Sequence, residues 1–276
     1  MLARIMSPDI SKKSSIDFSR LALLLFCVAT VLLIPLERFV LGGTFWLAGI
    51  LTLTRVPASI RFRLGILYGA VACLALAPIN TDRSNSHMAQ LALWMTVVVL
   101  APAALMRWHE PGALEWRLLP RRLQWLDIFY VAISIPLAWG VLKFYLFLAN
   151  PELPTHWPMP ADFDPEARWR LIAGINAVGV WDELFFVNTV YGILRTLFPK
   201  RLANLAQAVV YTAVLYHMAF TGIGPLVVYA FALTQGAMYE RSRCLLFVLI
   251  VHLIVDAFLV AAILQYHYPR TGFHWF

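Results

Sequence analysis

The sequence has little charge. Only 13% of its 276 residues are Asp, Glu, Lys or Arg, and 15 of these are acidic, whereas a soluble domain carries about 25% charged residues. A chain of this length in water would cover one core with charged side chains, and this chain has too few of them. Hydrophobic residues instead make up 61% of it. The composition therefore predicts an integral membrane protein.

Cysteine is also scarce. Cys27, Cys73 and Cys244 share no metal-binding or redox spacing, so we interpret them as packing residues rather than as disulfide partners or metal ligands. The net charge of +7 comes from 22 basic residues spread along the chain between apolar runs. Because nucleic-acid-binding proteins concentrate basic residues on one face or helix, we expect no nucleic-acid partner.

Long apolar segments are abundant. A membrane span needs roughly 20 mostly apolar residues, because a helix rises about 1.5 Å per residue through a hydrocarbon core about 30 Å thick. Nine segments fit, at residues 20–36, 39–54, 64–81, 87–106, 125–147, 169–194, 202–220, 223–239 and 243–266. The Gly-Ile-Gly-Pro turn signal at 222–225 separates the seventh from the eighth. We predict an all-α, polytopic transmembrane helix bundle with about eight or nine spans.

The basic residues predict an orientation. With the N-terminus in the cytoplasm, sixteen of them fall in inside segments and five outside, as the positive-inside rule requires. We expect the cytoplasmic (plasma) membrane of a prokaryote. The chain divides into N-terminal helices at 1–166, about five spans ending in a proline-rich outer loop, and a four-span bundle at 167–268.

Ionisable residues deep inside the apolar spans are concentrated in that second part, whereas spans one to four carry almost none at depth. Those of the second part are Asp182, Glu183, His217, His252 and Asp256. A charged group at the bilayer centre costs at least about 2.5–3.5 kcal/mol, so we expect these side chains to face one another or water. His252 and Asp256 are four residues apart and therefore share a helix face. The five residues are candidate catalytic groups; the alternative is that they make structural polar contacts between helices.

Asp182 and Glu183 are adjacent, so they point in directions about 100° apart on a helix. Glu183 continues a stripe of small and polar residues with Asn176 and Gly179, whereas Asp182 continues a bulky apolar stripe. Close packing of membrane helices favours small residues. This pattern predicts that Glu183 points into the bundle and acts as a general base on water.

Three short motifs follow one another along these spans. Asp182-Glu183 opens a segment similar to Glu-Glu-x-x-x-Arg, His217 fits the end of Phe-x-x-x-His, and His252 with Asp256 matches His-x-x-x-Asn/Asp. Together they resemble the CPBP (CAAX protease and bacteriocin-processing) family of glutamic intramembrane proteases, which includes the CAAX prenyl endopeptidases. The resemblance implies an intramembrane endopeptidase that cleaves a membrane-associated peptide or protein, with water activated by a glutamate and a histidine.

The sequence departs from the family pattern in the first two motifs. Without gaps, Asp182 occupies the position of the family's catalytic glutamate, so the active carboxylate is Asp182 or Glu183. Val187 replaces the motif Arg and removes a charge-assisted donor. The neighbouring Asn188 is a candidate for contacting the substrate or the oxyanion. Ala213 stands where the second motif has its aromatic residue.

Two other readings stay open. A proton-coupled transporter or a non-catalytic immunity-type membrane protein would use the same buried acids and imidazoles as a proton relay. The other hypothesis is a zinc hydrolase, because some catalytic zinc sites use two histidines and a carboxylate as ligands. We expect no cofactor, since the zinc-protease motif His-Glu-x-x-His is absent.

Overall fold

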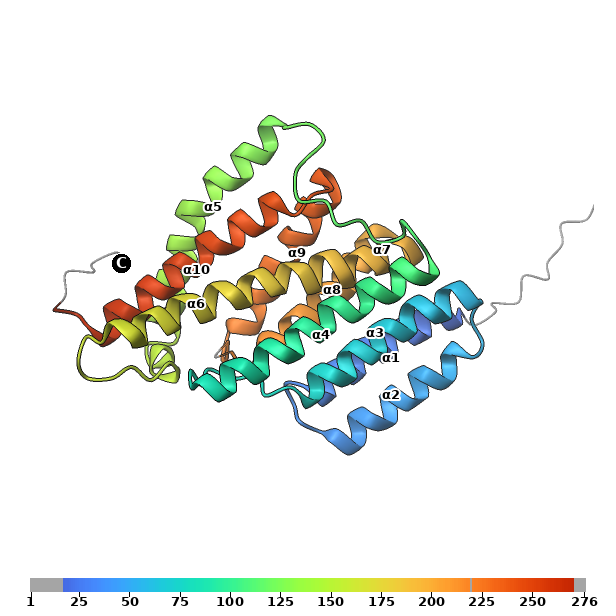
Figure 1. Ribbon diagram of the computed structural model, residues 1–276, viewed down its shortest axis with the longest axis horizontal. Helices are drawn as coiled ribbons and strands as arrows, with labels where there is room; N and C mark the ends of the chain where they lie inside the picture. The colour runs from blue at the N-terminus through green and yellow to red at the C-terminus, as the bar shows by residue number, and fades with distance from the viewer. Residues whose placement is uncertain (1–16, 219, 271–276) are drawn as a thin grey trace, which may run out of the picture.

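The computed structural model describes residues 17–218 and 220–270, and within them it is built of helices without a β-strand (Figure 1). The α-helices are α1 (Phe18–Leu33), α2 (Phe39–Leu53), α3 (Ala58–Leu76), α4 (Asn85–His109), α5 (Trp125–Lys143), α6 (Pro165–Asp182), α7 (Gly192–Leu197), α8 (Lys200–Leu215), α9 (Gly224–Ser242) and α10 (Leu246–His267). Two π-helical segments, η1 (Phe144–Ala149) and η3 (Glu183–Tyr191), and a 3-10 turn, η2 (Leu153–His156), complete the described elements. The expected all-α class is confirmed.

Each of the nine predicted spans overlaps an α-helix, and the sixth continues from α6 through η3 into α7; the boundaries differ most at the third. The span was expected at 64–81, but α3 begins at Ala58. The early start is possible because Arg61 donates to backbone carbonyls at the end of α2, including Leu53 O at 3.0 Å. The helix stops at Leu76 because Pro78 holds Ala77 in an extended conformation.

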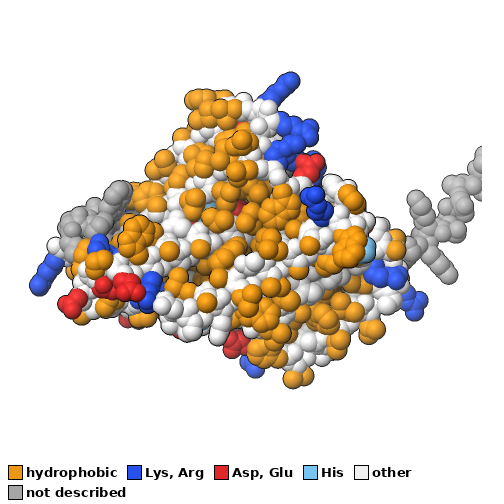
Figure 2. Space-filling model, viewed as in Figure 1, with side chains coloured by type: hydrophobic (Ala, Val, Ile, Leu, Met, Phe, Trp, Pro, Cys, Tyr) orange, Lys and Arg blue, Asp and Glu red, His pale blue; other side chains and the backbone are white. Residues whose placement is uncertain are grey.

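The helical surface suits a membrane. Five helical segments are long and apolar enough to cross one: Ala58–Leu76, Asn85–His109, Trp125–Ala149, Pro165–Leu197 and Leu246–His267. Figure 2 shows hydrophobic side chains over most of the visible face, with Lys and Arg mainly at its margins. The protein is an integral membrane protein; the nine spans and the cytoplasmic N-terminus stay predictions. Arg4, Lys12 and Lys13, on which the N-terminal assignment partly depends, lie outside the described residues.

The two parts of the chain pack against each other. In the N-terminal part α1 lies along α2, and it also contacts α8 of the C-terminal part. Helix α5 packs against α10 (Figure 1). The α6–η3–α7 segment contacts α4, α8, α9 and α10. The helix that carries Asp182 and Glu183 is therefore surrounded by helices from both parts.

The helix ends that the sequence analysis assigns to the cytoplasm lie together, in what we call the Arg-rich end. It comprises the connections at 54–57, 110–124, 198–199 and 243–245. Ion pairs cross it from helix to helix: Arg63 Nε lies 2.5 Å from Glu110 Oε2, and Arg241 binds the buried carboxylate of Asp127. The connections are thereby held in defined positions.

Glu240, in the last turn of α9, binds three cations at this end. Its carboxylate oxygens lie 2.6 Å from Arg195 Nε, 2.6 Å from Lys200 Nζ and 3.0 Å from Arg243 Nη2, and one also accepts from the Tyr191 hydroxyl. Burial alone would raise the pKa of Glu240. The hydrogen bonds from Lys200 and Arg195 together outweigh this effect, so the pKa of Glu240 lies below the ordinary value of 4.5. The folded protein thus favours the ionised carboxylate.

We expect Glu240→Gln to lower the stability at neutral pH by about 1.5–3 kcal/mol, the worth of a hydrogen bond to a charged group. The measurement is the thermal unfolding midpoint of the detergent-solubilised protein. A carboxylate with a lowered pKa contributes stability that is lost as the pH falls through that pKa. The difference in unfolding midpoint between wild type and variant should therefore narrow below about pH 4.5. The exposed Glu152→Gln is the control, and a gap that widens on acidification would contradict the interpretation.

Candidate active site

Asp182 and Glu183 lie midway along the continuous helical segment Pro165–Leu197, where α6 passes into η3. The backbone is wider in η3, because π-helical hydrogen bonds join residues five apart instead of four. The Thr189 hydroxyl also donates to the carbonyl of Leu184, five residues earlier, at 2.9 Å. Such irregular turns occur frequently at functional sites. Here the irregularity begins at the candidate catalytic glutamate.

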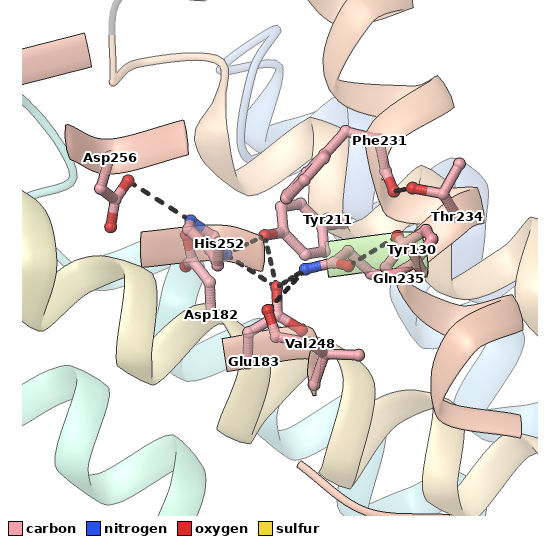
Figure 3. A network of polar contacts seen from close by, with 10 residues as sticks. All are labelled: Tyr130, Asp182, Glu183, Tyr211, Phe231, Thr234, Gln235, Val248, His252 and Asp256. Carbon is pink, nitrogen blue, oxygen red and sulfur yellow. Dashed lines mark hydrogen bonds and ion pairs between the residues drawn. The ribbon is translucent and has the colours of Figure 1, made fainter. Parts of the chain in front are cut away.

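Glu183 is fully buried, and one of its oxygens accepts three hydrogen bonds (Figure 3). Oε1 lies 2.7 Å from His252 Nδ1, 3.0 Å from Gln235 Nε2 and 3.2 Å from the Tyr211 hydroxyl. These donors belong to α10, α9 and α8 respectively. A single carboxylate oxygen therefore ties three helices to η3 and fixes the position of the imidazole.

The imidazole of His252 has carboxylates on two edges. Nδ1 faces Glu183, while Nε2 lies 3.6 Å from Asp256 Oδ1 and 3.8 Å from Asp182 Oδ2 (Figure 3). When Nδ1 carries the hydrogen that Glu183 accepts, Nε2 has a free lone pair. The distances from Nε2 to the two aspartates exceed a direct hydrogen bond.

Gly179, one turn before Glu183, allows α10 to come this close to α6. A Cβ atom at this position would collide with Asp256 Oδ2 and lie 2.9 Å from His252 Cδ2. Only a residue without a side chain permits the imidazole and the Asp256 carboxylate to lie against the α6 backbone. The small-residue stripe seen in the sequence therefore packs against the polar face of α10.

A cavity of about 600 Å³ lies against this group. Asp182, Tyr211, His252 and Asp256 form part of its wall, whereas Glu183 lies behind the imidazole and does not line it. Most of the remaining wall is apolar and comes from α5, α6, α9 and α10, with a polar section at residues 80–83 and Arg170. The cavity thus connects an apolar volume to a group of acids and one imidazole.

His217 is not brought to this group. It lies beyond the end of α8 at Leu215, with Nε2 2.9 Å from the Ile34 carbonyl and 3.7 Å from Glu37 Oε1 in the α1–α2 connection. The seventh span was expected to reach residue 220, but a turn begins at Tyr216. This shorter helix directs the imidazole to the α1–α2 connection. The α8 residue that hydrogen-bonds Glu183 is Tyr211, six residues earlier in the chain.

Asn188 also lies away from the cavity. It is fully buried in η3, and its Oδ1 accepts from the Tyr239 hydroxyl at 2.8 Å. Val187, at the position of the motif Arg, is buried as well. The structure therefore brings together Asp182, Glu183, His252 and Asp256 and separates the other two sequence candidates from them.

Three polar residues of the site were not singled out from the sequence as functional. Tyr211 contacts both Glu183 and His252 Nδ1, the latter at 3.0 Å; Gln235 also donates to Val248 O, and it accepts from the Tyr130 hydroxyl at 3.1 Å. A tyrosine in an apolar span usually packs between helices, so Tyr211 and Tyr130 gave no sign of a functional role. Among these three residues, Gln235 is the one whose position in the sequence indicates a polar site, because its amide lies in a long stretch without charged residues.

Among residues 17–218 and 220–270, no group of three or more His, Cys, Asp or Glu side chains is arranged to hold a metal ion. His217, the second imidazole of the zinc reading, is hydrogen-bonded at the α1–α2 connection.

Comparison with known proteins finds a family match for the segment that contains this site. Residues 164–258, which are 95 of the 276, match the family described as type II CAAX prenyl endopeptidase Rce1-like. The match runs from the start of α6 into α10 and contains the whole acid and imidazole group. The resemblance to CAAX proteases is thereby confirmed for this segment, and it supports a peptidase at the level of the family. No curated protein and no solved structure matches the chain.

Proposed function

We propose that this protein is an intramembrane endopeptidase that cleaves a membrane-associated peptide or protein with a water activated by the Glu183–His252 pair. The observation that carries the proposal is the imidazole of His252, which lies between Glu183 and two aspartates on the wall of a largely apolar cavity. The family match at 164–258 supports the same class of reaction.

In the proposed mechanism Glu183 accepts the Nδ1–H of His252 and sets the tautomer, so that Nε2 is the base. A water held between Nε2, Asp182 and Asp256 attacks the scissile carbonyl carbon, and its proton passes to Nε2. The imidazolium then donates this proton to the leaving amide nitrogen as the C–N bond breaks. Burial excludes bulk water and strengthens the interaction between the carboxylates and the transient imidazolium.

The cavity indicates the kind of substrate. Its apolar wall from α5, α6 and α9 would accommodate an apolar side chain or lipid group, and the peptide bond would then lie against His252. The proposed partners are therefore a membrane-associated substrate and the lipid bilayer. We propose the plasma membrane of a prokaryote as the location, with the N-terminus in the cytoplasm.

The test is cleavage by the purified protein reconstituted in liposomes. The probes are a fluorogenic peptide with an apolar anchor and the same peptide carrying a prenyl group on a cysteine. Cleavage of either supports the proposal, and the ratio of their kcat/KM values measures the contribution of the lipid. Proton flux without cleavage of either peptide would favour the transporter hypothesis instead.

We propose that the reaction needs no metal. Activity should persist after dialysis against a chelator, with the metal content measured in the same sample. A stoichiometric zinc ion whose removal abolishes cleavage and whose return restores it would overturn this part of the proposal.

We expect His217→Ala to retain most of the cleavage activity, because His217 bonds to the α1–α2 connection and does not line the cavity. The loss of its hydrogen bond to the Ile34 carbonyl should lower stability by about 0.5–1.5 kcal/mol. Initial rates and unfolding midpoints measured on the same preparation separate the two effects. A folded His217→Ala protein without activity would show that the histidine acts in catalysis.

A further inference from the structure

A second cavity, of about 240 Å³, lies at the Arg-rich end, and none of its lining residues borders the cavity beside His252. Three arginines from different elements line it: Arg63 of α3, Arg195 of α7 and Arg243 after α9. The remaining lining residues are Gly112, Ala113, Leu114, Glu115, Gly192, Thr196 and Tyr239. No feature of the proposed protease reaction uses this cavity.

The arginine side chains are held in position by their other contacts. Arg63 uses Nε for Glu110, at 2.5 Å, and Nη1 for the Thr196 hydroxyl, at 2.7 Å. Arg243 uses Nε for the backbone carbonyl of Glu240 and Nη2 for its carboxylate, both at 3.0 Å. A guanidinium has five N–H donors, so each keeps donors beyond those that fix it.

The same arrangement leaves the cavity positive. Glu240 is shared by Arg195, Arg243 and Lys200, so one carboxylate faces three cations. The cavity wall itself contains three arginines and one carboxylate, that of Glu115, and Glu110 pairs with Arg63 from outside the lining. With Lys200 included, four cations therefore meet three carboxylates, which leaves one positive charge in excess. Held guanidinium groups with an excess of positive charge favour an oxyanion, and phosphate is one of the anions that matches the planar donor geometry of arginine.

We infer that this cavity binds a phosphate group, either of an anionic phospholipid or of a soluble phosphate compound. Its place at the ends of membrane helices puts it at the level where lipid phosphates lie and where basic residues recognise anionic head groups. Arg195 and Gly192 belong to the same continuous helical segment as Glu183. A bound phosphate would therefore hold the α7 end of the helix that carries the acidic residues.

The experiment measures ligand-dependent thermal unfolding of the full-length protein in a neutral detergent. One arm titrates short-chain phosphatidylglycerol against short-chain phosphatidylcholine, and the other titrates potassium phosphate against potassium chloride at equal ionic strength. We expect a midpoint that rises with the phosphate-bearing anion. Arg63→Gln and Arg243→Gln should each weaken the apparent Kd about tenfold or more, as expected for a lost charge-assisted hydrogen bond.

The matched controls are Arg55→Gln and Arg201→Gln, which remove the same charge from exposed positions at the same end but outside the cavity. They should bind as the wild type does. Stabilisation by phosphatidylglycerol alone assigns the site to a lipid head group, and stabilisation by inorganic phosphate assigns it to the phosphate itself. No stabilisation by either anion, or equal weakening in pocket and control variants, would overturn the inference whatever the result of the cleavage assay.

Discussion

Glu183→Gln and His252→Ala are each expected to lower kcat for peptide cleavage by about two to four orders of magnitude, the usual contribution of general acid–base catalysis. His252→Ala removes the proposed base. Glu183→Gln keeps the size of the side chain, but an amide no longer supplies the negative charge that stabilises the imidazolium. The Oε1 atom of Glu183 is the common acceptor for His252, Gln235 and Tyr211, so no other group can take its place without movement of α8, α9 or α10.

The measurement must separate a lost base from a damaged fold. For Glu183→Gln we expect kcat to fall with KM nearly unchanged, because Glu183 does not line the cavity that would contain the substrate. The unfolding midpoint of each variant reports the structural effect, and His217→Ala is the control with a histidine removed elsewhere. Wild-type kcat in a folded Glu183→Gln or His252→Ala protein would be incompatible with the mechanism.

Asp182→Asn distinguishes the two adjacent carboxylates. Asp182 lines the cavity and lies 3.8 Å from His252 Nε2, whereas Glu183 hydrogen-bonds Nδ1 at 2.7 Å. If Asp182 only helps to hold the water, its amide variant should keep part of the activity, because an amide oxygen still accepts a hydrogen bond. A larger loss for Asp182→Asn than for Glu183→Gln would make Asp182 the main base and His252 its partner.

Gly179→Ala is expected to lower both stability and activity. An exposed helical glycine replaced by alanine would gain up to about 1 kcal/mol from helix propensity. At this position the new methyl group would collide with Asp256 Oδ2 and approach His252 Cδ2 at 2.9 Å, and overpacking in a tight interface costs about 1–3 kcal/mol. The cost of the collision should exceed the gain in helix propensity, so stability falls. Moving α10 away from α6 would also separate His252 from Asp182, which should lower the activity.

The control for this substitution is Gly174→Ala in the same helix. Its methyl group would meet only Met88 Cε, at the ordinary contact distance of 3.6 Å. The thermal unfolding midpoint should fall for Gly179→Ala and stay constant or rise for Gly174→Ala. Equal midpoints for the two variants would show that α6 and α10 are not closely packed at Gly179.

Much of the fold follows from composition and local pattern. Charge scarcity and apolar run length predict helices in a membrane, and each of the nine predicted spans overlaps an α-helix. The boundaries were less accurate, because Arg61 binds the end of α2 and Pro78 stops α3 early. The contact of Arg61 with the neighbouring helix is not visible in hydropathy, whereas Pro78 is a local signal in the sequence.

The sequence by itself determined that the protein is an all-helical membrane protein and that its buried acids and imidazoles are concentrated in one segment. It also placed His252 and Asp256 on one helix face, because helical periodicity depends only on residue spacing. Contacts between helices were decided by the tertiary structure alone. The end of α8 at Leu215 removes His217 from the site and leaves Tyr211 there, and Gly179 brings α10 against α6. These outcomes depend on where helices end and how closely they pack, which periodicity within one helix does not specify.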